Sequence, residues 1–167
     1  MDVEVSDRFS TTFHAIQDHF AEVFKSLFGG GQAELTLTEK DYLTAGVEIK
    51  VQPPGKKLQH LSLLSGGERA LSAIALLFAI LKVRSAPFVI LDEVEAALDE
   101  ANVMRYASYL RTLSKETQFI VITHRKGTME MCDRLYGVTM QEMGVSRLVS
   151  VNLNTIDAVS YTHLTLP

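Results

Sequence analysis

The N-terminal segment of the chain carries its apolar side chains along one stripe of a predicted helix. They recur at alternating intervals of four and three residues, at Phe9, Phe13, Ile16, Phe20, Val23 and Leu27. This alternation is typical of a coiled-coil seam. Because the run covers only about three heptads, an amphipathic helix lying on its own domain is an equally good interpretation. The glycines at 29–31 should end the helix, since glycine favours neither helix nor strand.

Two stretches with a period of two follow the glycines. Residues 33–37 and 47–51 each place apolar side chains at every second position, with polar ones between them. Such alternation predicts two half-buried antiparallel strands. Pro53, Pro54 and Gly55 then predict a turn.

From Ser65 onward the pattern predicts helices that alternate with buried strands. A long helix is expected over about 67–83 and a polar helix over about 100–114. Residues 88–91 and 119–122 are short, continuous apolar runs, which are typical of strands buried on both faces of a parallel sheet. Strand–helix–strand order of this kind predicts an α/β fold whose core is a parallel sheet with flanking helices.

The end of the chain carries a short predicted helix near Met129 and two more alternating stretches, 135–140 and 146–153, which we expect to be closing strands. Residues 157–167 are set apart from the fold as a non-native tail. The stretch 159–164 looks like one reading frame of a common sequencing-library adapter. The chain is therefore expected to be a fragment of a gene product.

Composition narrows the class of protein. The length of 167 residues, 47% of them apolar, fits one domain with its own core. The formal charge is 16 − 20 = −4, which argues against a grip on nucleic acid along the whole chain but is compatible with a local basic patch. Cys132 is the single cysteine, so a reducing compartment is expected. The longest apolar stretch, 70–83, is too short to cross a bilayer, and a cytoplasmic location is expected.

The strongest local signal is the run at 64–69. Ser65 followed three residues later by Glu68 is the pattern of a helix capping box. That interpretation leaves Gly66 and Gly67 unexplained, because each glycine costs about 1 kcal/mol relative to alanine inside a helix. Two glycines do allow an anion to approach bare N–H groups at a helix N-terminus, and Ser65 can add a hydroxyl donor. We therefore favour a phosphate-binding motif.

The second signal is a pair of carboxylates after the apolar run 88–91. Asp92 lies where open α/β sheets place their ligands and suits a Mg²⁺ ion held partly through water. Glu93 points elsewhere and is suited to polarising an attacking water. A strand that simply ends in a polar turn is the competing interpretation.

Two further residues complete the set of candidates. Asp99 precedes a predicted helix, where an N-cap role is expected in any case. His124 follows the apolar run 119–122, so it should lie at the same sheet edge as Asp92. A histidine there is often a satisfied structural group, but a neutral imidazole can also hydrogen-bond a γ-phosphate or the attacking water.

These residues together resemble the ABC-type ATPases. In chain order they match the signature motif at 65–68, the Walker B motif at 90–93, the D-loop at 97–99 and the switch histidine at 123–124. Finer resemblance is to the heads of bacterial SMC (structural maintenance of chromosomes) proteins, and it covers about 9–153. It is almost letter for letter at 61–71, 91–103 and 119–129.

The resemblance implies a domain division. Residues 1–28 become the C-terminal root of a coiled-coil arm, and 32–153 become the C-terminal lobe of an ABC-type ATPase head. The chain has no G-x-x-x-x-G-K-[ST] run and so lacks a phosphate-cradling P-loop. In SMC proteins that motif lies in the N-terminal half of the same head, and the present chain alone is expected to hydrolyse no ATP.

The family also implies a function in chromosome condensation and segregation, close to the nucleoid. Two heads of a homodimer would enclose ATP and Mg²⁺, with Ser65, Gly66, Gly67 and Glu68 of one head facing the nucleotide of the other. Glu93 and His124 would serve hydrolysis. A kleisin subunit and DNA are implied as partners, and no membrane. The basic pair at 56–57 lies near the expected contact between heads, but a solvated turn explains it better than a DNA contact.

Three alternatives remain at the level of sequence. A transporter nucleotide-binding domain would share the motifs but usually has a helical subdomain before the signature, where this chain has strands. An interaction module with a decayed ATPase site would be expected to lose Glu93 or the signature glycines, which are intact. The head of a double-strand-break repair ATPase is closer and harder to separate.

Overall fold

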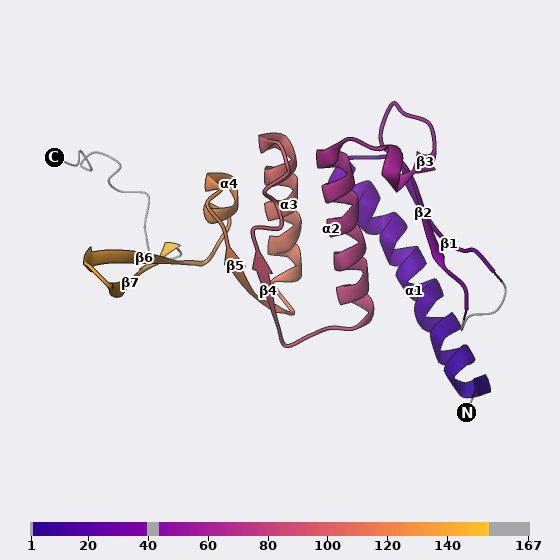
Figure 1. Ribbon diagram of the computed structural model, residues 1–167, viewed down its shortest axis with the longest axis horizontal. Coiled ribbons are helices and arrows are strands. Elements are labelled where there is room, and N and C mark those ends of the chain that lie inside the picture. Colours follow the sequence, from indigo (N-terminus) through magenta and orange to yellow (C-terminus); the bar gives the residue numbers. More distant parts are fainter. Residues whose placement is uncertain (1, 40–43, 154–167) are drawn as a thin grey trace.

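The computed structural model describes residues 2–39 and 44–153. The predicted tail at 157–167 lies outside this range. The elements in chain order are α1 Asp2–Phe28, β1 Gln32–Leu37, β2 Val47–Gln52, β3 Gln59–His60, the 3₁₀ helix η1 Leu61–Leu63, α2 Gly66–Val83, β4 Phe88–Asp92, α3 Glu100–Leu113, β5 Gln118–Ile122, α4 Lys126–Met129, β6 Arg134–Glu142 and β7 Val145–Asn152. Figure 1 shows them arranged along the long axis, from α1 and the β1–β3 sheet to the β6–β7 hairpin.

Helix α1 packs against β1 and against α2 and α3. Its C-terminal end is more deeply buried than the heptad pattern indicates, because Phe24 and Phe28 join Phe20 and Leu27 in the core. The rings of Phe24 and Phe28 stack with their centroids 4.1 Å apart. Phe9, near the other end, is 37% exposed. This helix therefore packs on its own domain from Phe13 onward, and of the apolar stripe Phe9 is exposed.

The turn after α1 depends on glycine. Gly31 has a φ of +85°, and a Cβ atom at this position would lie 2.2 Å from the carbonyl oxygen of Gln52. Any other residue would clash with the backbone of β2. The predicted antiparallel strands follow at once, with β1 paired to β2 in the register Ala33–Val51 and Leu35–Ile49, and β3 completes this sheet.

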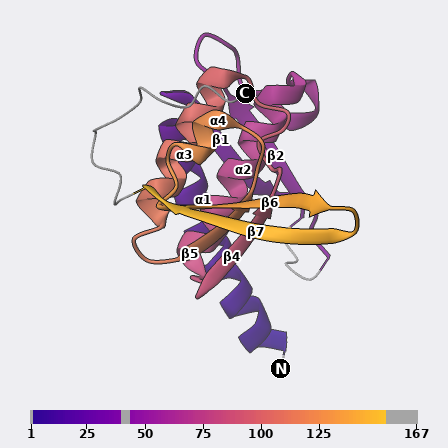
Figure 2. The same cartoon turned by 90° about the vertical axis from the view of Figure 1, so that its left-hand side faces the viewer.

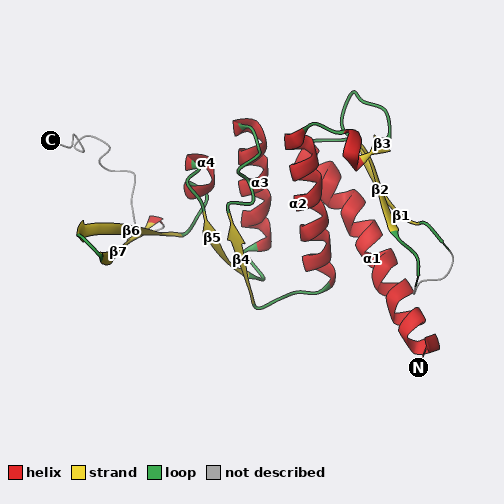
Figure 3. Ribbon diagram, viewed as in Figure 1, coloured by secondary structure: helices red, strands yellow, loops and turns green. Residues whose placement is uncertain are grey.

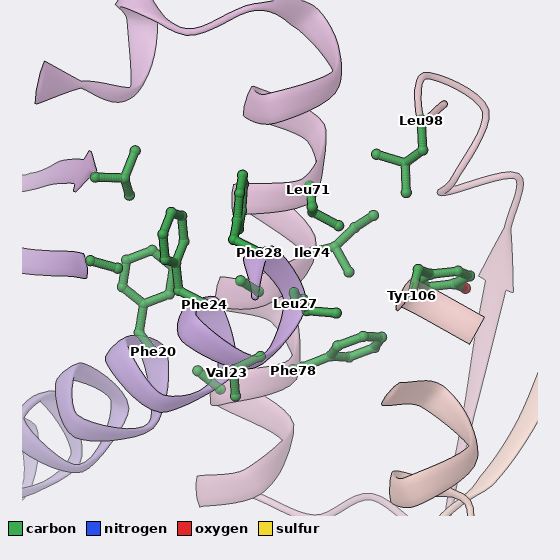
Figure 4. Packing of buried hydrophobic residues seen from close by; sticks show 14 of the residues in the cluster. Phe20, Val23, Phe24, Leu27, Phe28, Leu71, Ile74, Phe78, Leu98 and Tyr106 are labelled. Atoms are coloured by element: carbon green, nitrogen blue, oxygen red, sulfur yellow. The ribbon is translucent and has the colours of Figure 1, made fainter. Parts of the chain in front are cut away.

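One continuous core joins α1, α2 and α3. Figure 4 shows side chains of α1 and α2 facing each other, with Phe78 extending toward Tyr106 of α3. The rings of Phe78 and Tyr106 stack at a centroid distance of 6.0 Å. Figure 3 shows the three long helices side by side, with the β1–β3 sheet beyond α1.

Strands β4 and β5 form the predicted parallel pair, in the register Ile90–Ile120 and Asp92–Ile122. The prediction that both faces are buried is wrong for this chain. Leu91 is buried in the core, but Ile90 is 58% exposed and Ile122 is 52% exposed. The reason is that these side chains point away from the core, and no described residue of this chain covers that face.

The predicted closing strands form a separate antiparallel hairpin. Strands β6 and β7 pair with each other from Arg134–Asn152 to Glu142–Val145, and within the described residues they do not join the β4–β5 pair. Figure 2 shows the hairpin lying across the end of the molecule. Among the described residues, no helix is both long enough and apolar enough to cross a lipid bilayer.

Candidate functional site

The start of α2 is a complete capping box. Ser65 is the N-cap, and its hydroxyl accepts a hydrogen bond from the backbone N–H of Glu68 and donates one to Glu68 Oε2, at 2.7 Å. The carboxylate also accepts from the backbone N–H of Ser65, at 3.2 Å. The capping interpretation is therefore correct as far as it goes, and both residues are already engaged within one helix turn.

Lys56 binds the same carboxylate. Its ammonium group lies 2.8 Å from Glu68 Oε1, which joins the turn after β2 to the first turn of α2. Hydrogen bonds from Lys56 and then from the Ser65 hydroxyl hold the pKa of the Glu68 carboxyl below its ordinary value. Lys56 thus contacts the capping box, while its side chain is still 48% exposed.

The two glycines of this turn differ in what surrounds them. A Cβ atom at Gly67 would lie 3.2 Å from the carbonyl oxygen of Ala97, so this glycine lets the loop after β4 approach the start of α2. A Cβ atom at Gly66 would meet nothing within 4 Å. Internal packing therefore explains Gly67 but not Gly66. At Gly66 the helix N-terminus is open to an incoming group, where the helix dipole favours negative charge.

A second group of residues gathers at the carboxyl end of the parallel pair. Asp92 is the last residue of β4 and is exposed. Glu93 follows with a φ of 48°, the one positive φ of a non-glycine residue in the described ranges. Its N–H donates to the carbonyl of Ile122, at 2.9 Å, so the turn is anchored to β5. A conformation of this kind costs about 1–3 kcal/mol and persists only where its surroundings fix it.

His124 lies beside Glu93, as the order of strands predicts. Its Nδ1 is 3.3 Å from Glu93 Oε1, and the two side chains are 66% and 54% exposed. The pair is therefore open to solvent and to a ligand. A carboxylate and an imidazole at this separation can share the task of orienting and deprotonating a water molecule.

Asp99 is the N-cap of α3. Its Oδ1 accepts from the backbone N–H of Asn102, at 2.8 Å, and its Oδ2 accepts from the side-chain amide of the same residue, at 3.2 Å. The structural role expected for Asp99 is thus present, and it fixes the end of the loop 93–99, which begins at Glu93, to the start of α3.

Among the described residues, the two groups of candidates do not share a side-chain interaction, although the loop after β4 approaches the start of α2 at Gly67. In the part of the chain that the structure describes, no hydrogen bond or ion pair joins residues 65–68 to Asp92, Glu93 or His124. The same lobe therefore presents two chemical faces, a helix N-terminus and a carboxylate–imidazole pair.

The residues at the end of β4 fit a magnesium site that has few protein ligands. Within the described ranges, no cluster of three or more histidine, cysteine or acidic side chains forms an all-protein metal cage. Mg²⁺ usually keeps several waters and is held by one or two carboxylates together with phosphate oxygens. Asp92, an exposed carboxylate at the strand end, fits that donor set.

Sequence reasoning missed one functional candidate, Glu95. Its side chain is 1% exposed. Its Oε1 accepts hydrogen bonds from Thr123, at 2.5 Å, and from Thr128, at 3.0 Å. The only signal in the sequence was one more acidic residue in an acidic loop, which does not distinguish a buried carboxyl from an exposed one.

Comparison with known proteins shows the family of this chain. A family model described as the RecF/RecN/SMC N terminal domain matches residues 3–147. The chromosome partition protein Smc of Bacillus subtilis (strain 168) is 70% identical over 154 residues, which are 92% of this chain and 13% of that protein. The chain thus spans about an eighth of the length of this relative.

Solved structures give the same result for the fold. One comes from work on ATP-driven dimerization and DNA-stimulated activation of SMC ATPases; it has a TM-score of 0.81 and 43% identity over 89% of this chain and 91% of that one. The Smc head domain from Pyrococcus furiosus, with an extended coiled coil and bound to the C-terminal domain of ScpA, has a TM-score of 0.83 and 44% identity over 92% of this chain and 38% of that one. The chain belongs to the RecF/RecN/SMC family, and within it the resemblance is to the ATPase heads of bacterial SMC proteins.

Proposed function

We propose that this chain is the C-terminal lobe of the ATPase head of a chromosome condensation and segregation SMC protein. The observation that carries the proposal is the exposed Glu93–His124 pair at the end of β4 and β5, in a lobe that also presents an open helix N-terminus at Gly66. The pair serves ATP hydrolysis in the lobe's own head. The helix N-terminus engages the ATP that a second head holds, so the functional unit is a homodimer of heads.

Each candidate residue has a defined task in this proposal. Glu93 accepts a proton from the attacking water, and His124 orients that water or hydrogen-bonds the γ-phosphate. Asp92 contributes a carboxylate to Mg²⁺, which when bound neutralises charge on the phosphate oxygens. Asp99 fixes the loop 93–99, and this loop faces the partner head at the edge of the site.

The signature residues act on the other nucleotide. Gly66 and Gly67 present backbone N–H groups to a γ-phosphate, and the Ser65 hydroxyl turns from Glu68 to the phosphate. Glu68 remains bonded to Lys56, so the helix turn keeps its anchor when the hydroxyl leaves. A solved relative studied for ATP-driven dimerization supports this arrangement.

The N-terminal half of the same head is the first partner. This chain covers 38% of the solved Pyrococcus furiosus head with its coiled coil, so most of that chain lies outside the present one. The apolar face of β4 and β5, with Ile90 and Ile122 more than half exposed, is a surface of the kind that a packed α/β layer covers. We propose that the missing half, which carries the P-loop, covers it.

Ile90→Lys should prevent the two halves from associating, because it places a charge in the proposed interface. The isolated lobe should keep its melting temperature, since Ile90 is already 58% exposed there. Co-purification of a tagged N-terminal half measures the effect. The matched control is Val47→Lys, because Val47 is also a β-branched strand residue and is 53% exposed. Association that survives Ile90→Lys would place the N-terminal half elsewhere.

The purified lobe alone should show no Mg²⁺-dependent ATP turnover, because it lacks a phosphate cradle. Mixing it with the N-terminal half should restore turnover. The measurement is phosphate release, with Glu93→Gln as the control for contaminating ATPases. Turnover by the parental lobe alone that Glu93→Gln abolishes would refute the division of labour between the halves.

Partners beyond the head follow the relatives. The Pyrococcus furiosus head is bound to ScpA, and we propose that a kleisin subunit binds this head. From similarity to these relatives we also propose that DNA is a partner and that the protein is associated with the nucleoid in the cytoplasm. The relatives compared above are SMC proteins, which favours this function over the transporter and repair alternatives.

A further inference from the structure

Besides the contact between Glu93 and His124 themselves, three hydrogen bonds join the loops that carry them. The first runs from the N–H of Glu93 to the carbonyl of Ile122, at 2.9 Å. The second runs from the Thr123 hydroxyl to Glu95 Oε1, at 2.5 Å. The third runs from the guanidinium of Arg125 to the carbonyl of Leu98, at the far end of the two loops.

Glu95 lies at the centre of these hydrogen bonds. Thr123, which donates to it, also accepts a hydrogen bond from the backbone N–H of Arg125, at 3.0 Å. The Thr123 hydroxyl therefore joins the backbone on the far side of His124 to one buried carboxyl. Within its own loop Glu95 is held by the N–H of Leu98, which donates to the Glu95 carbonyl at 3.0 Å.

The folding of the loop does not by itself explain why residue 95 has a carboxyl side chain. The side chain is 1% exposed, and its second oxygen, Oε2, has no hydrogen-bond partner among the described residues. Burying a polar oxygen without a partner costs stability. An apolar residue of similar size would avoid that cost but would leave Thr123 without its acceptor.

We propose that Glu95 is a positioning residue for the Glu93–His124 pair: its carboxyl holds Thr123, and through Thr123 it sets where the His124 imidazole lies relative to Glu93. The proposal rests on the proposed ATPase function. Its physical basis is that hydrogen bonds away from water hold geometry firmly, while Glu93 sits in a strained conformation that its surroundings must maintain.

The two threonines bonded to Glu95 allow a matched test. Each donates one hydroxyl hydrogen bond to Glu95 Oε1, and each can be replaced by valine, which has nearly the same shape. Thr123 is the neighbour of His124. Thr128 lies in α4 and donates to the same oxygen, but it is not a neighbour of His124 in the chain.

The experiment uses the head assembled from both halves. Steady-state ATP hydrolysis, ATP-dependent dimer formation and melting curves are measured for the parent, Glu95→Ala, Glu95→Gln, Thr123→Val and Thr128→Val. Thr123→Val and Glu95→Ala should lower kcat about 10- to 100-fold, because misplaced catalytic groups lose rate at this scale. KM for ATP and dimer formation should stay as in the parent. Glu95→Gln should keep most of kcat, since its amide oxygen still accepts from Thr123.

Thr128→Val should lower the melting temperature as much as Thr123→Val but leave kcat at the parental value. Equal losses of kcat in the two threonine variants, or a kcat in Thr123→Val equal to that of the parent, would reduce Glu95 to a packing residue. If Glu95→Ala fails to fold, the two threonine variants decide alone. Failure of the proposed function looks different, because Glu93→Gln would then hydrolyse ATP at the parental rate.

Discussion

In the head assembled from both halves, Glu93→Gln should slow ATP hydrolysis by about 10²- to 10⁴-fold, the usual contribution of a general base, and still bind ATP and form dimers. The amide cannot take the proton of the attacking water. It has the same shape as the carboxylate and can occupy the same backbone conformation, so the nucleotide pocket and the contact between heads are spared. Single-turnover hydrolysis and sedimentation with ATP measure the two effects.

The matched control is Glu116→Gln, the same change at an exposed position after α3. It should leave both the rate and the dimer as in the parent. Turnover by Glu93→Gln at the parental rate would remove Glu93 from the chemistry. Loss of ATP binding would show instead that its carboxylate holds the nucleotide.

Ser65→Arg should give a folded head that binds ATP but neither dimerises nor hydrolyses it. A long cation at the N-cap blocks the approach of the other head's γ-phosphate region, while the head's own pocket lies elsewhere. Loss of the cap costs about 0.5–2 kcal/mol of stability, which a head with a continuous core should withstand. Sedimentation with ATP, nucleotide binding and a melting curve test the three parts of this expectation.

Ser65→Ala is the control for the cap, since it removes the same hydroxyl without adding bulk. The melting temperatures of Ser65→Ala and Ser65→Arg should agree, whereas only the second should abolish the dimer. ATP-dependent dimers of Ser65→Arg would reduce Ser65 to an ordinary N-cap. The capping box seen in the structure is then its whole role.

Periodicity predicted the order of elements because each element buries one face. The helix α2, the strands β1 and β2 and the parallel pair β4–β5 all lie within a residue or two of their predicted ranges. The position of His124 beside Glu93 was also predictable, because carboxyl ends of adjacent parallel strands meet at one edge.

Other features could not be predicted from the sequence, because they depend on contacts between distant parts of the chain or with another chain. The apolar run at 88–91 is continuous because both faces of β4 suit burial, yet one face has no cover in the described residues, and composition does not say which chain supplies it. Glu95 reads like its acidic neighbours, since burial depends on where Thr123 and Thr128 arrive in space. The need for Gly67 came from its approach to Ala97, a contact between separate loops.

The central claim is that the signature residues of one head act on the ATP held by the other. Mixing Ser65→Arg heads with Glu93→Gln heads tests it most directly, because each variant alone should be inactive. A mixed dimer carries one arginine in place of two, so one of its two nucleotide sites is free of the block. The nucleotide held by the Ser65→Arg head meets an intact Glu93 on its own side and an intact Ser65 from the other head. We therefore expect the mixture, combined before ATP is added, to hydrolyse ATP at a rate well above the sum of the rates of the two separate samples. As a control, a Ser65→Arg/Glu93→Gln double variant mixed with Glu93→Gln heads should show no such gain. If Ser65 and Glu93 served the same nucleotide within one head, every site in the first mixture would carry a defect, and its rate would stay at that sum.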